Sequence, residues 1–225
     1  SGATITVPTA PTTAVTDTLL LMNFNDLGLV DSLARKDSEA LGNTQLSTAQ
    51  KKFGTSSALF DGSGDYILLR DLAAPRGYAS WTIECWIYIA AHKNYNFYYS
   101  AGTNIQLGVG ADGRLGAWLA NGVDGYFVNN LASTGDALST TTWYHVALVR
   151  DYSAGTVTWF IDGTASGQAT SVTAIIDYDG TTHSLGAYKD GTLPFHGYID
   201  EFRITDGQAV YTEDFTAPTA AFPNS

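Results

Sequence analysis

The chain of 225 residues has a single cysteine, Cys85, so no disulfide can form within it. Cys85 falls on the apolar side of an alternating stretch, where a buried and unreactive thiol is the usual case. It does not lie at the start of a helix, so it lacks the setting that activates a catalytic thiol. We therefore expect a core residue without a chemical role.

Positive charge is also scarce, because 11 lysines and arginines are set against 22 aspartates and glutamates, for a formal net charge of −11. An acidic surface without a basic stripe repels phosphate backbones and anionic lipids. No apolar run approaches the roughly 20 residues that a membrane helix needs. The sequence therefore predicts neither a nucleic-acid partner nor insertion into a membrane.

Helical periodicity is missing, and strand periodicity takes its place. The stretch WTIECWIYI at 81–89 alternates strictly, with apolar residues at every odd position, which is the period of a strand. The stretches at 142–151 and 156–163 alternate in the same way and are joined by turn-forming residues. Strands that recur at this spacing predict an all-β fold of two antiparallel sheets, a β-sandwich or jelly roll.

Composition changes near both ends suggest the domain boundaries. We expect the sandwich at 17–206, a linker or the end of a preceding unit at 1–16, and a C-terminal extension or linker at 207–225. The sequence TVPTA at 6–10 nearly recurs as TAPTA at 216–220, and such Pro-containing stretches favour extended connectors. Either the chain is one unit of a tandem array, or its ends are simply polar.

Five stretches carry a family resemblance when they are taken in order. They are KKFGTSSALFDGSGDYILL, WTIECWIYI, TWYHVALVRD, TVTWFIDGT and FHGYIDEFRI. Together they resemble the laminin G-like branch of the concanavalin A-like lectin/glucanase superfamily, from Thr18 to Thr205. The resemblance implies a concanavalin A-like sandwich.

The stretch RITDGQAVYTEDFTAPTAAFP at 203–223 is similar to the segment that follows such domains in structural proteins of tailed bacteriophages. This resemblance implies a virion protein of a tail or capsid appendage, with other virion subunits as partners. Folding in the reducing host cytoplasm and release within a particle would explain a stable extracellular domain without disulfides.

The same superfamily includes glucanases, which use paired carboxylates on one strand, so catalysis needs a direct test. The glutamates do not form such a pattern: they are Glu39, Glu84, Glu201 and Glu213. Glu84 lies alone on its strand, and we expect it to pair with a cross-strand Lys, Arg or backbone donor. The histidines lack the i, i+4 spacing of a helical zinc site. The sequence therefore predicts a domain without enzymatic activity.

The resemblance also implies a structural calcium ion. Calcium takes 6–8 oxygen ligands from carboxylates, amides and carbonyls. The positions that match the family are Asp200, Asn25, Gly64 and Asp65. The alternative is that Asp61 and Asp65 only cap a glycine turn by bonding to nearby backbone.

Two stretches combine aromatic rings with polar side chains, as sugar-binding sites do. The first contains Asn94, Tyr95, Asn96 and Tyr98 after a strand end. The second, before the last strand, contains Tyr188, Asp190 and His196.

Two tryptophans, Trp86 and Trp118, are expected to floor a groove between these stretches. The alternative for each aromatic side chain is ordinary packing within or across the sheets.

Three functions follow for this sequence, in order of preference. The first is a non-catalytic module that binds carbohydrate or a host cell surface. The second is an architectural or decoration protein of a virion that binds no sugar. The third is a polysaccharide-cleaving enzyme.

Overall fold

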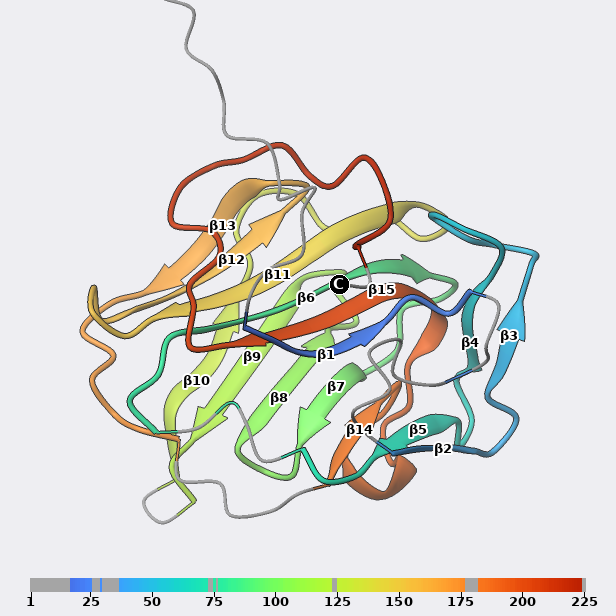
Figure 1. The fold of residues 1–225 in the computed structure, drawn as a ribbon, viewed down its shortest axis with the longest axis horizontal. Helices are drawn as coiled ribbons and strands as arrows, with labels where there is room; N and C mark the ends of the chain where they lie inside the picture. Colours follow the sequence, from blue (N-terminus) through green and yellow to red (C-terminus); the bar gives the residue numbers. More distant parts are fainter. Residues whose placement is uncertain are drawn as a thin grey trace, which may run out of the picture.

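The computed structural model describes residues 17–25, 29, 37–72, 75, 77–122, 125–176 and 182–223. Apart from one 3₁₀ turn at Lys189–Gly191, the regular secondary structure in these ranges consists of β-strands. They form two antiparallel sheets that pack face to face (Figure 1). The predicted β-sandwich is therefore confirmed. Within the same ranges, no helix has the length and apolar character needed to span a membrane.

The first sheet, here called the β6 sheet, has eight strands. Its order is β13 (Thr164–Ala169), β12 (Thr156–Ile161), β11 (Trp143–Asp151), β6 (Trp81–Ile89), β15 (His196–Asp206), β4 (Ser57–Asp61) and β3 (Gln45–Ser47). The eighth strand, β1 (Thr18–Met22), pairs with the second half of β15.

The second sheet, here called the β9 sheet, has seven strands. Its order is β10 (Tyr126–Ala132), β9 (Leu115–Ala120), β8 (Ile105–Val109), β7 (Asn96–Ala101), β14 (His183–Leu185), β5 (Tyr66–Leu69) and β2 (Ser38–Leu41). Strands β7 to β10 follow one another as a meander, whereas β14, β5 and β2 join from distant parts of the chain.

The main core lies between the two sheets and follows from the alternation in sequence. Along β6, Ile83, Cys85 and Ile87 belong to this core and are essentially fully buried. The expected core position of Cys85 is confirmed, and burial raises the pKa of its thiol well above the ordinary value. Each fully buried isoleucine of this strand contributes about 1.5–3 kcal/mol to the free energy of unfolding.

The other face of β6 is also buried, because residues 207–223 cross the outside of the β6 sheet (Figure 1). We call this segment the C-terminal strap. Its Tyr211 and Phe215 stack on each other with ring centroids 3.6 Å apart and pack against Phe160 of β12. The C-terminal extension predicted from the sequence thus packs on the sandwich, and its residues 209–215 form a second, smaller core with the outer face of the sheet.

Glu84 lies beneath the strap and has the predicted cross-strand partner. Arg203 of β15 is its register neighbour and donates two hydrogen bonds to Oε1 of Glu84. Burial alone would raise the pKa of Glu84, but Arg203 and His145 together lower it to about 2. Glu84 is therefore a structural anion of the fold.

Candidate functional site

The outer face of the β9 sheet carries four aromatic rings in mutual contact. Tyr95 stacks on Phe97 at 6.1 Å between centroids, and Trp118 lies 5.8 Å from Tyr95 and 5.4 Å from Phe97. Tyr188 lies 5.6 Å from Phe97 on the other side. We call Tyr95, Phe97, Trp118 and Tyr188 the aromatic cluster.

Backbone pairing explains why residues so far apart in sequence meet in this cluster. The Phe97 amide donates to the Leu193 carbonyl at 3.1 Å, and Phe97 forms a parallel bridge with Pro194. The two stretches that the sequence analysis selected, 94–98 and 188–196, are therefore neighbours in space. Tyr95 has a φ of 56° just before β7, and half of its side-chain surface remains exposed.

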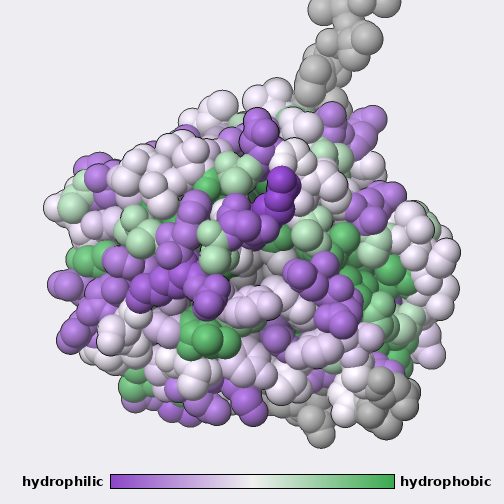
Figure 2. All heavy atoms as spheres, turned by 180° about the vertical axis from the view of Figure 1, so that it is seen from behind, coloured by the Kyte–Doolittle hydropathy of each residue, from purple (hydrophilic) through white to green (hydrophobic). Residues whose placement is uncertain are grey.

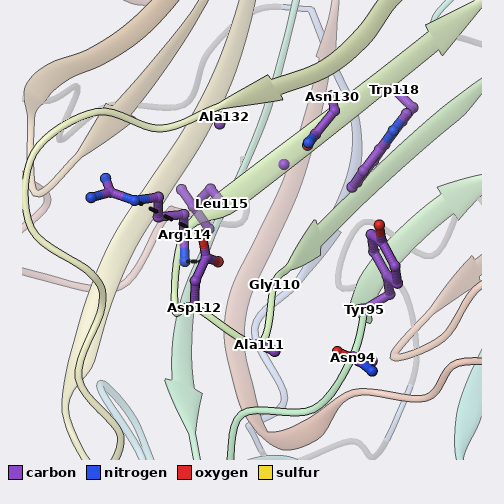
Figure 3. A pocket seen from close by; sticks show the side chains of 11 residues that line it. Asn94, Tyr95, Gly110, Ala111, Asp112, Arg114, Leu115, Trp118, Asn130 and Ala132 are labelled. Carbon is purple, nitrogen blue, oxygen red and sulfur yellow. Dashed lines mark hydrogen bonds and ion pairs between the residues drawn. The ribbon is translucent and has the colours of Figure 1, made fainter.

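Beside the aromatic cluster lies a pocket of about 290 Å³, here called the first pocket (Figure 3). Its lining residues come from the segment just before β7, the β8–β9 turn, β9 and β10: Asn94, Tyr95, Gly110, Ala111, Asp112, Arg114, Leu115, Gly116, Trp118, Asn130 and Ala132. Figure 3 shows Tyr95, Trp118 and Asn130 along one side of the pocket, with Asn94 close to Tyr95.

A pair of glycines opens the floor of this face. Gly108 of β8 lies directly opposite Gly116 of β9 in the register. A Cβ atom at Gly116 would lie 2.7 Å from Cη2 of Trp118 and 2.9 Å from Oδ1 of Asn130. The missing side chain therefore lets the indole ring and the Asn130 amide come together over the strand.

The polar groups of the pocket differ in their freedom to bind a ligand. The Asp112 Oδ1 accepts the Arg114 amide at 3.1 Å, and the Arg114 guanidinium points away from the pocket to donate to the Gly135 carbonyl at 2.5 Å (Figure 3). The side chains of Asn94 and Asn130 are exposed and have no hydrogen-bond partner among the described residues. Both amides are therefore available to a polar ligand beside an aromatic surface.

Tyr188 is half-buried at the far end of the aromatic cluster. Burial raises the pKa of its hydroxyl, with smaller contributions from Tyr126 and Asp190. The hydroxyl of Tyr126 accepts a hydrogen bond from Nε2 of Gln106 at 2.7 Å. The ring of Tyr126 is thus held on the same face of the sheet.

The residues proposed from the sequence for the first stretch divide into two groups. Asn94 and Tyr95 line the first pocket. Asn96 is fully buried, and its Nδ2 donates to the Ala91 carbonyl at 3.2 Å. Tyr98 is buried in the main core, 6.4 Å from the ring of Phe195. Because the neighbouring Phe97 faces outward, strand alternation turns Tyr98 inward, so the structure gives neither Asn96 nor Tyr98 a place on the ligand-facing surface.

The residues proposed for the second stretch are also separated. Tyr188 belongs to the aromatic cluster, and Asp190 lies exposed on the adjacent 3₁₀ turn with a φ of 61°. His196 lies on β15 of the opposite sheet, in register with Asp61. Its strand therefore places His196 away from the first pocket.

The expected groove between Trp86 and Trp118 does not form, because β6 and β9 belong to different sheets. Trp118 lies in the first pocket. Trp86 lies on the outer face of the β6 sheet, where the Lys52 ammonium is 3.7 Å from the centre of its ring and Phe53 packs edge-on. A lone alternating strand shows which residues share a face but not which sheet the strand joins.

Several residues of the site were not selected from the sequence. Phe97, Gly116 and Asn130 are the main ones. The glycines at alternate positions in LGVG and LGAW were a usable signal, because a glycine within a strand marks a close approach of other groups. No pattern in the sequence marked Asn130, because its position at the pocket depends on a bulge in β10.

The four residues proposed for calcium are separated into two places. Oδ1 of Asn25 accepts the Thr55 amide, and Oδ2 of Asp200 accepts the amides of Lys52 and Phe53. Gly64 and Asp65 belong instead to the β4–β5 turn, where Asp65 caps the backbone of Asn43 and Asp61. Asp65 therefore makes backbone hydrogen bonds of the kind that the capping alternative expects.

The donors around Asp200 do not suit a cation. Three backbone N–H groups point at its carboxylate, and burial nevertheless raises its pKa to about 6. Within the described ranges, no three acidic, histidine or cysteine side chains gather in a way that could hold a metal ion. The described residues of the proposed set therefore do not fit calcium, and calcium binding stays an untested prediction of the resemblance.

The described carboxylates at the first pocket do not form a catalytic pair. Among the described lining residues of the first pocket, Asp112 alone carries a carboxylate. Glu84 and Glu201 are buried under the strap, and Glu39 pairs with Arg70 on the surface. Glycosidases of the usual kind need two carboxyl groups facing one sugar ring, which the described residues of this pocket do not supply.

The side of the molecule opposite to the view of Figure 1 mixes hydrophilic and hydrophobic residues (Figure 2). Its apolar side chains form small separate groups between polar ones. Aromatic rings can stack on the apolar face of a polar ligand, while amides bond to its hydroxyl groups. The first pocket combines both kinds of group.

Solved structures with the same fold are numerous. Domain 4 of AbnA, a GH43 extracellular arabinanase from Geobacillus stearothermophilus solved in complex with arabinotriose, superposes with a TM-score of 0.67 at 20% identity, covering 85% of this chain and 93% of that one. The botulinum neurotoxin serotype D ligand binding domain in complex with N-acetylneuraminic acid gives a TM-score of 0.65 at 18% identity, over 84% of this chain and 47% of that one.

A third similar structure is the binding domain of Paraclostridial Mosquitocidal Protein 1, with a TM-score of 0.67 at 12% identity, over 86% of this chain and 49% of that one. The chain thus spans about half the length of the neurotoxin and mosquitocidal domains. At such low sequence identity, the structural similarity shows a shared fold. Comparison with curated protein sequences gave no match.

A family model described as the concanavalin A-like lectin/glucanases superfamily, of the laminin G type, matches residues 61–212. This range includes β6 to β15 and the first part of the strap. It agrees with the observed sandwich and with the resemblance read from the five sequence stretches. The chain belongs to the concanavalin A-like lectin/glucanase superfamily.

Proposed function

We propose that this protein is a non-catalytic carbohydrate-binding module, and that the first pocket with its aromatic cluster is the binding site. The observation that carries the proposal is the placement of Tyr95 and Trp118 beside the unpartnered amides of Asn94 and Asn130. The rings offer a stacking surface for the apolar face of a sugar, and the amides can donate to and accept from its hydroxyls.

The similar structures support this choice of ligand class. One was solved with arabinotriose and another with N-acetylneuraminic acid. A single carboxylate among the described lining residues of the pocket supports binding without hydrolysis, since hydrolysis needs an acid and a second carboxylate.

We further propose that the module is displayed on the tail or capsid of a tailed bacteriophage and contacts the host cell surface. The support is the similarity of residues 203–223 to phage structural proteins, noted above. A shallow sugar site of millimolar affinity corresponds to only about −4 kcal/mol. Many copies on one particle can raise the avidity about 10²–10⁴-fold, so display in many copies would suit such a site.

An architectural role in a virion is the second candidate, and one observation favours it. Tyr88, Trp143 and Tyr198 form a half-buried aromatic row on the outer face of the β6 sheet, with ring centroids 5.6 and 5.5 Å apart. Aromatic side chains of this kind are enriched at protein interfaces. This row could contact another virion subunit without any sugar.

A glycan array probed with a tetramerised domain separates the two functions. We expect binding to a defined glycan class that falls at least about tenfold in Trp118→Ala, or about 1.4 kcal/mol. Trp143→Ala is the matched control, because it removes a half-buried tryptophan from the opposite sheet. A flat response from the wild-type tetramer would reject carbohydrate binding and favour the architectural role.

The virion assignment needs its own test. Mass spectrometry of purified particles from the source phage should detect this chain at a fixed copy number. Its absence from intact particles would reject the assignment and leave the sugar-binding proposal untouched.

A further inference from the structure

A second pocket of about 400 Å³ lies on the other side of β10. Its lining residues come from β10 and from the end of β13 with the segment that follows it: Phe127, Val128, Asn129, Asn130, Leu131, Ala169, Thr170, Ser171, Val172, Thr173 and Ala174. Strand β10 is an edge of the β9 sheet, and β13 is an edge of the β6 sheet. The second pocket therefore lies at the open side of the sandwich.

The two pockets share Asn130. In the pairing of β10 with β9, Val128 lies opposite Leu119 and Leu131 lies opposite Ala117. The two residues Asn129 and Asn130 together therefore span the single position of Trp118, which makes a β-bulge. Asn130 takes the left-handed conformation, with a φ of 55°.

This bulge changes where two consecutive amides point. In a regular strand, one of two neighbouring side chains would face the core. Here both Asn129 and Asn130 are exposed, while Val128 is buried. Asn130 lies beside Trp118 and lines both pockets, whereas Asn129 lines only the second pocket. Bulges that redirect side chains are common next to binding sites. A non-glycine residue in the left-handed conformation, such as Asn130, is locally strained, and such strain is frequent at functional sites.

The second pocket has the chemistry of a sugar site and a firm outer wall. Three hydroxyl residues, Thr170, Ser171 and Thr173, line it together with Asn129. The wall is anchored in two ways, because Val172 is buried in the main core and Nη2 of Arg150 donates to the Ala174 carbonyl at 2.5 Å. The segment that closes the pocket is thus held by the fold itself.

We infer that the ligand is a linear oligosaccharide that lies across β10, with sugar units in both pockets and the Asn129–Asn130 pair at the crossing. This inference rests on the proposed function and names its ligand class: an internal stretch of a polysaccharide chain rather than one terminal sugar. Small-molecule pockets measure about 300–1,000 Å³. The first pocket alone is at the lower limit of this range, whereas the two pockets, which meet at Asn130, together offer room for several sugar units.

The test is an array that carries each glycan repeat at lengths from one to six sugar units. Wild type is compared with Asn129→Ala and Thr173→Val, which alter only the second pocket, and with Trp118→Ala, which alters the first. Gln208→Ala is the matched control, because it removes an exposed amide on the strap. All four substituted side chains are at least partly exposed, and thermal melting identifies any variant that fails to fold.

We expect wild type to bind chains of four or more units at least about tenfold more tightly than the single sugar, a difference of about 1.4 kcal/mol. Asn129→Ala and Thr173→Val should remove this gain and leave single-sugar binding unchanged. Binding that is independent of length and insensitive to both variants would overturn the inference while the proposed function stands. Absence of binding at every length would overturn both.

Discussion

Arg203 on β15 donates two hydrogen bonds to a single oxygen of Glu84 on the neighbouring strand β6, from Nε at 3.0 Å and from Nη2 at 2.6 Å. The other oxygen of Glu84 accepts the Tyr211 hydroxyl at 2.8 Å and lies 3.1 Å from Nε2 of His145. Both members of the ion pair are buried. One carboxylate therefore connects β6 to β15, β11 and the C-terminal strap.

Replacing this carboxylate should weaken the fold strongly. In Glu84→Gln, the Arg203 guanidinium would be left buried without its counterion, and breaking a buried pair costs about 3–5 kcal/mol. Urea unfolding monitored by tryptophan fluorescence measures the loss. Glu39→Gln is the matched control, because its pair with Arg70 is exposed and should cost at most about 1 kcal/mol. Equal losses in the free energy of unfolding of the two variants would show that the network under the strap contributes no more than an exposed ion pair.

The stability should depend on pH through Glu201. Burial, together with the neighbouring Asp200, raises the pKa of Glu201 to about 8 from its ordinary value of 4.5. Between about pH 4.5 and 8 the folded state therefore binds the proton that the unfolded state has lost, so the free energy of unfolding falls as the pH rises. Below about pH 4.5 the sign reverses, because the pKa of Glu84 is lowered to about 2 and protonation of Glu84 then favours the unfolded state.

The variant Glu201→Gln separates these two effects. It keeps an oxygen that can accept the Phe222 amide but cannot ionise, so most of the decline in stability between pH 6 and 8 should disappear. Urea unfolding at several pH values gives the slope for each protein. Glu213→Gln, on the exposed part of the strap, should retain the wild-type slope. An unchanged slope in Glu201→Gln would refute the assignment.

Removal of the strap should destabilise the sandwich. A chain that ends at Asp206 lacks Tyr211, Phe215 and Phe222, which are all buried, and each buried aromatic contributes about 1.5–3 kcal/mol. We expect a much lower melting temperature and increased binding of a hydrophobic dye. Tyr211→Phe is the milder variant, and loss of its bond to Glu84 should cost about 1–3 kcal/mol. A truncated chain that melts like wild type would show that residues 207–223 are only an extension.

A methyl group at Gly116 should disturb the sugar site with little effect on the fold. Its Cβ would lie 2.7 Å from the Trp118 ring, so the indole must move, although the backbone at this position suits any residue. We expect Gly116→Ala to weaken glycan binding at least about tenfold and to leave the far-ultraviolet circular dichroism unchanged. Wild-type affinity in this variant would argue against Trp118 as the stacking surface.

Chelation tests the calcium prediction. A calcium site at a free calcium concentration of 100 times its Kd would add about 2.7 kcal/mol to the free energy of unfolding. Because backbone N–H groups occupy the carboxylate of Asp200, we expect the melting temperature to stay the same after chelator treatment and after readdition of calcium chloride. A rise on readdition, absent with magnesium chloride, would show that other residues complete a site.

The sequence alone determined the fold class, the core position of Cys85 and the paired state of Glu84, and it named three aromatic residues of the candidate site, Tyr95, Trp118 and Tyr188. The first three follow from local alternation or from the energetic demand that a buried charge has a partner, whereas the aromatic residues follow from the mixture of rings and polar groups that sugar sites use. Such rules act over a few residues and do not depend on which strands become neighbours.

Only the tertiary structure decided that Trp86 and Trp118 belong to different sheets, that Tyr98 turns into the core, and that residues 207–223 cover the β6 sheet. It also placed Asn129 and Asn130 side by side on the outside of β10. The physical reason is that strand register and bulges depend on pairing between segments far apart in the chain, which the two-residue period of a single strand does not encode.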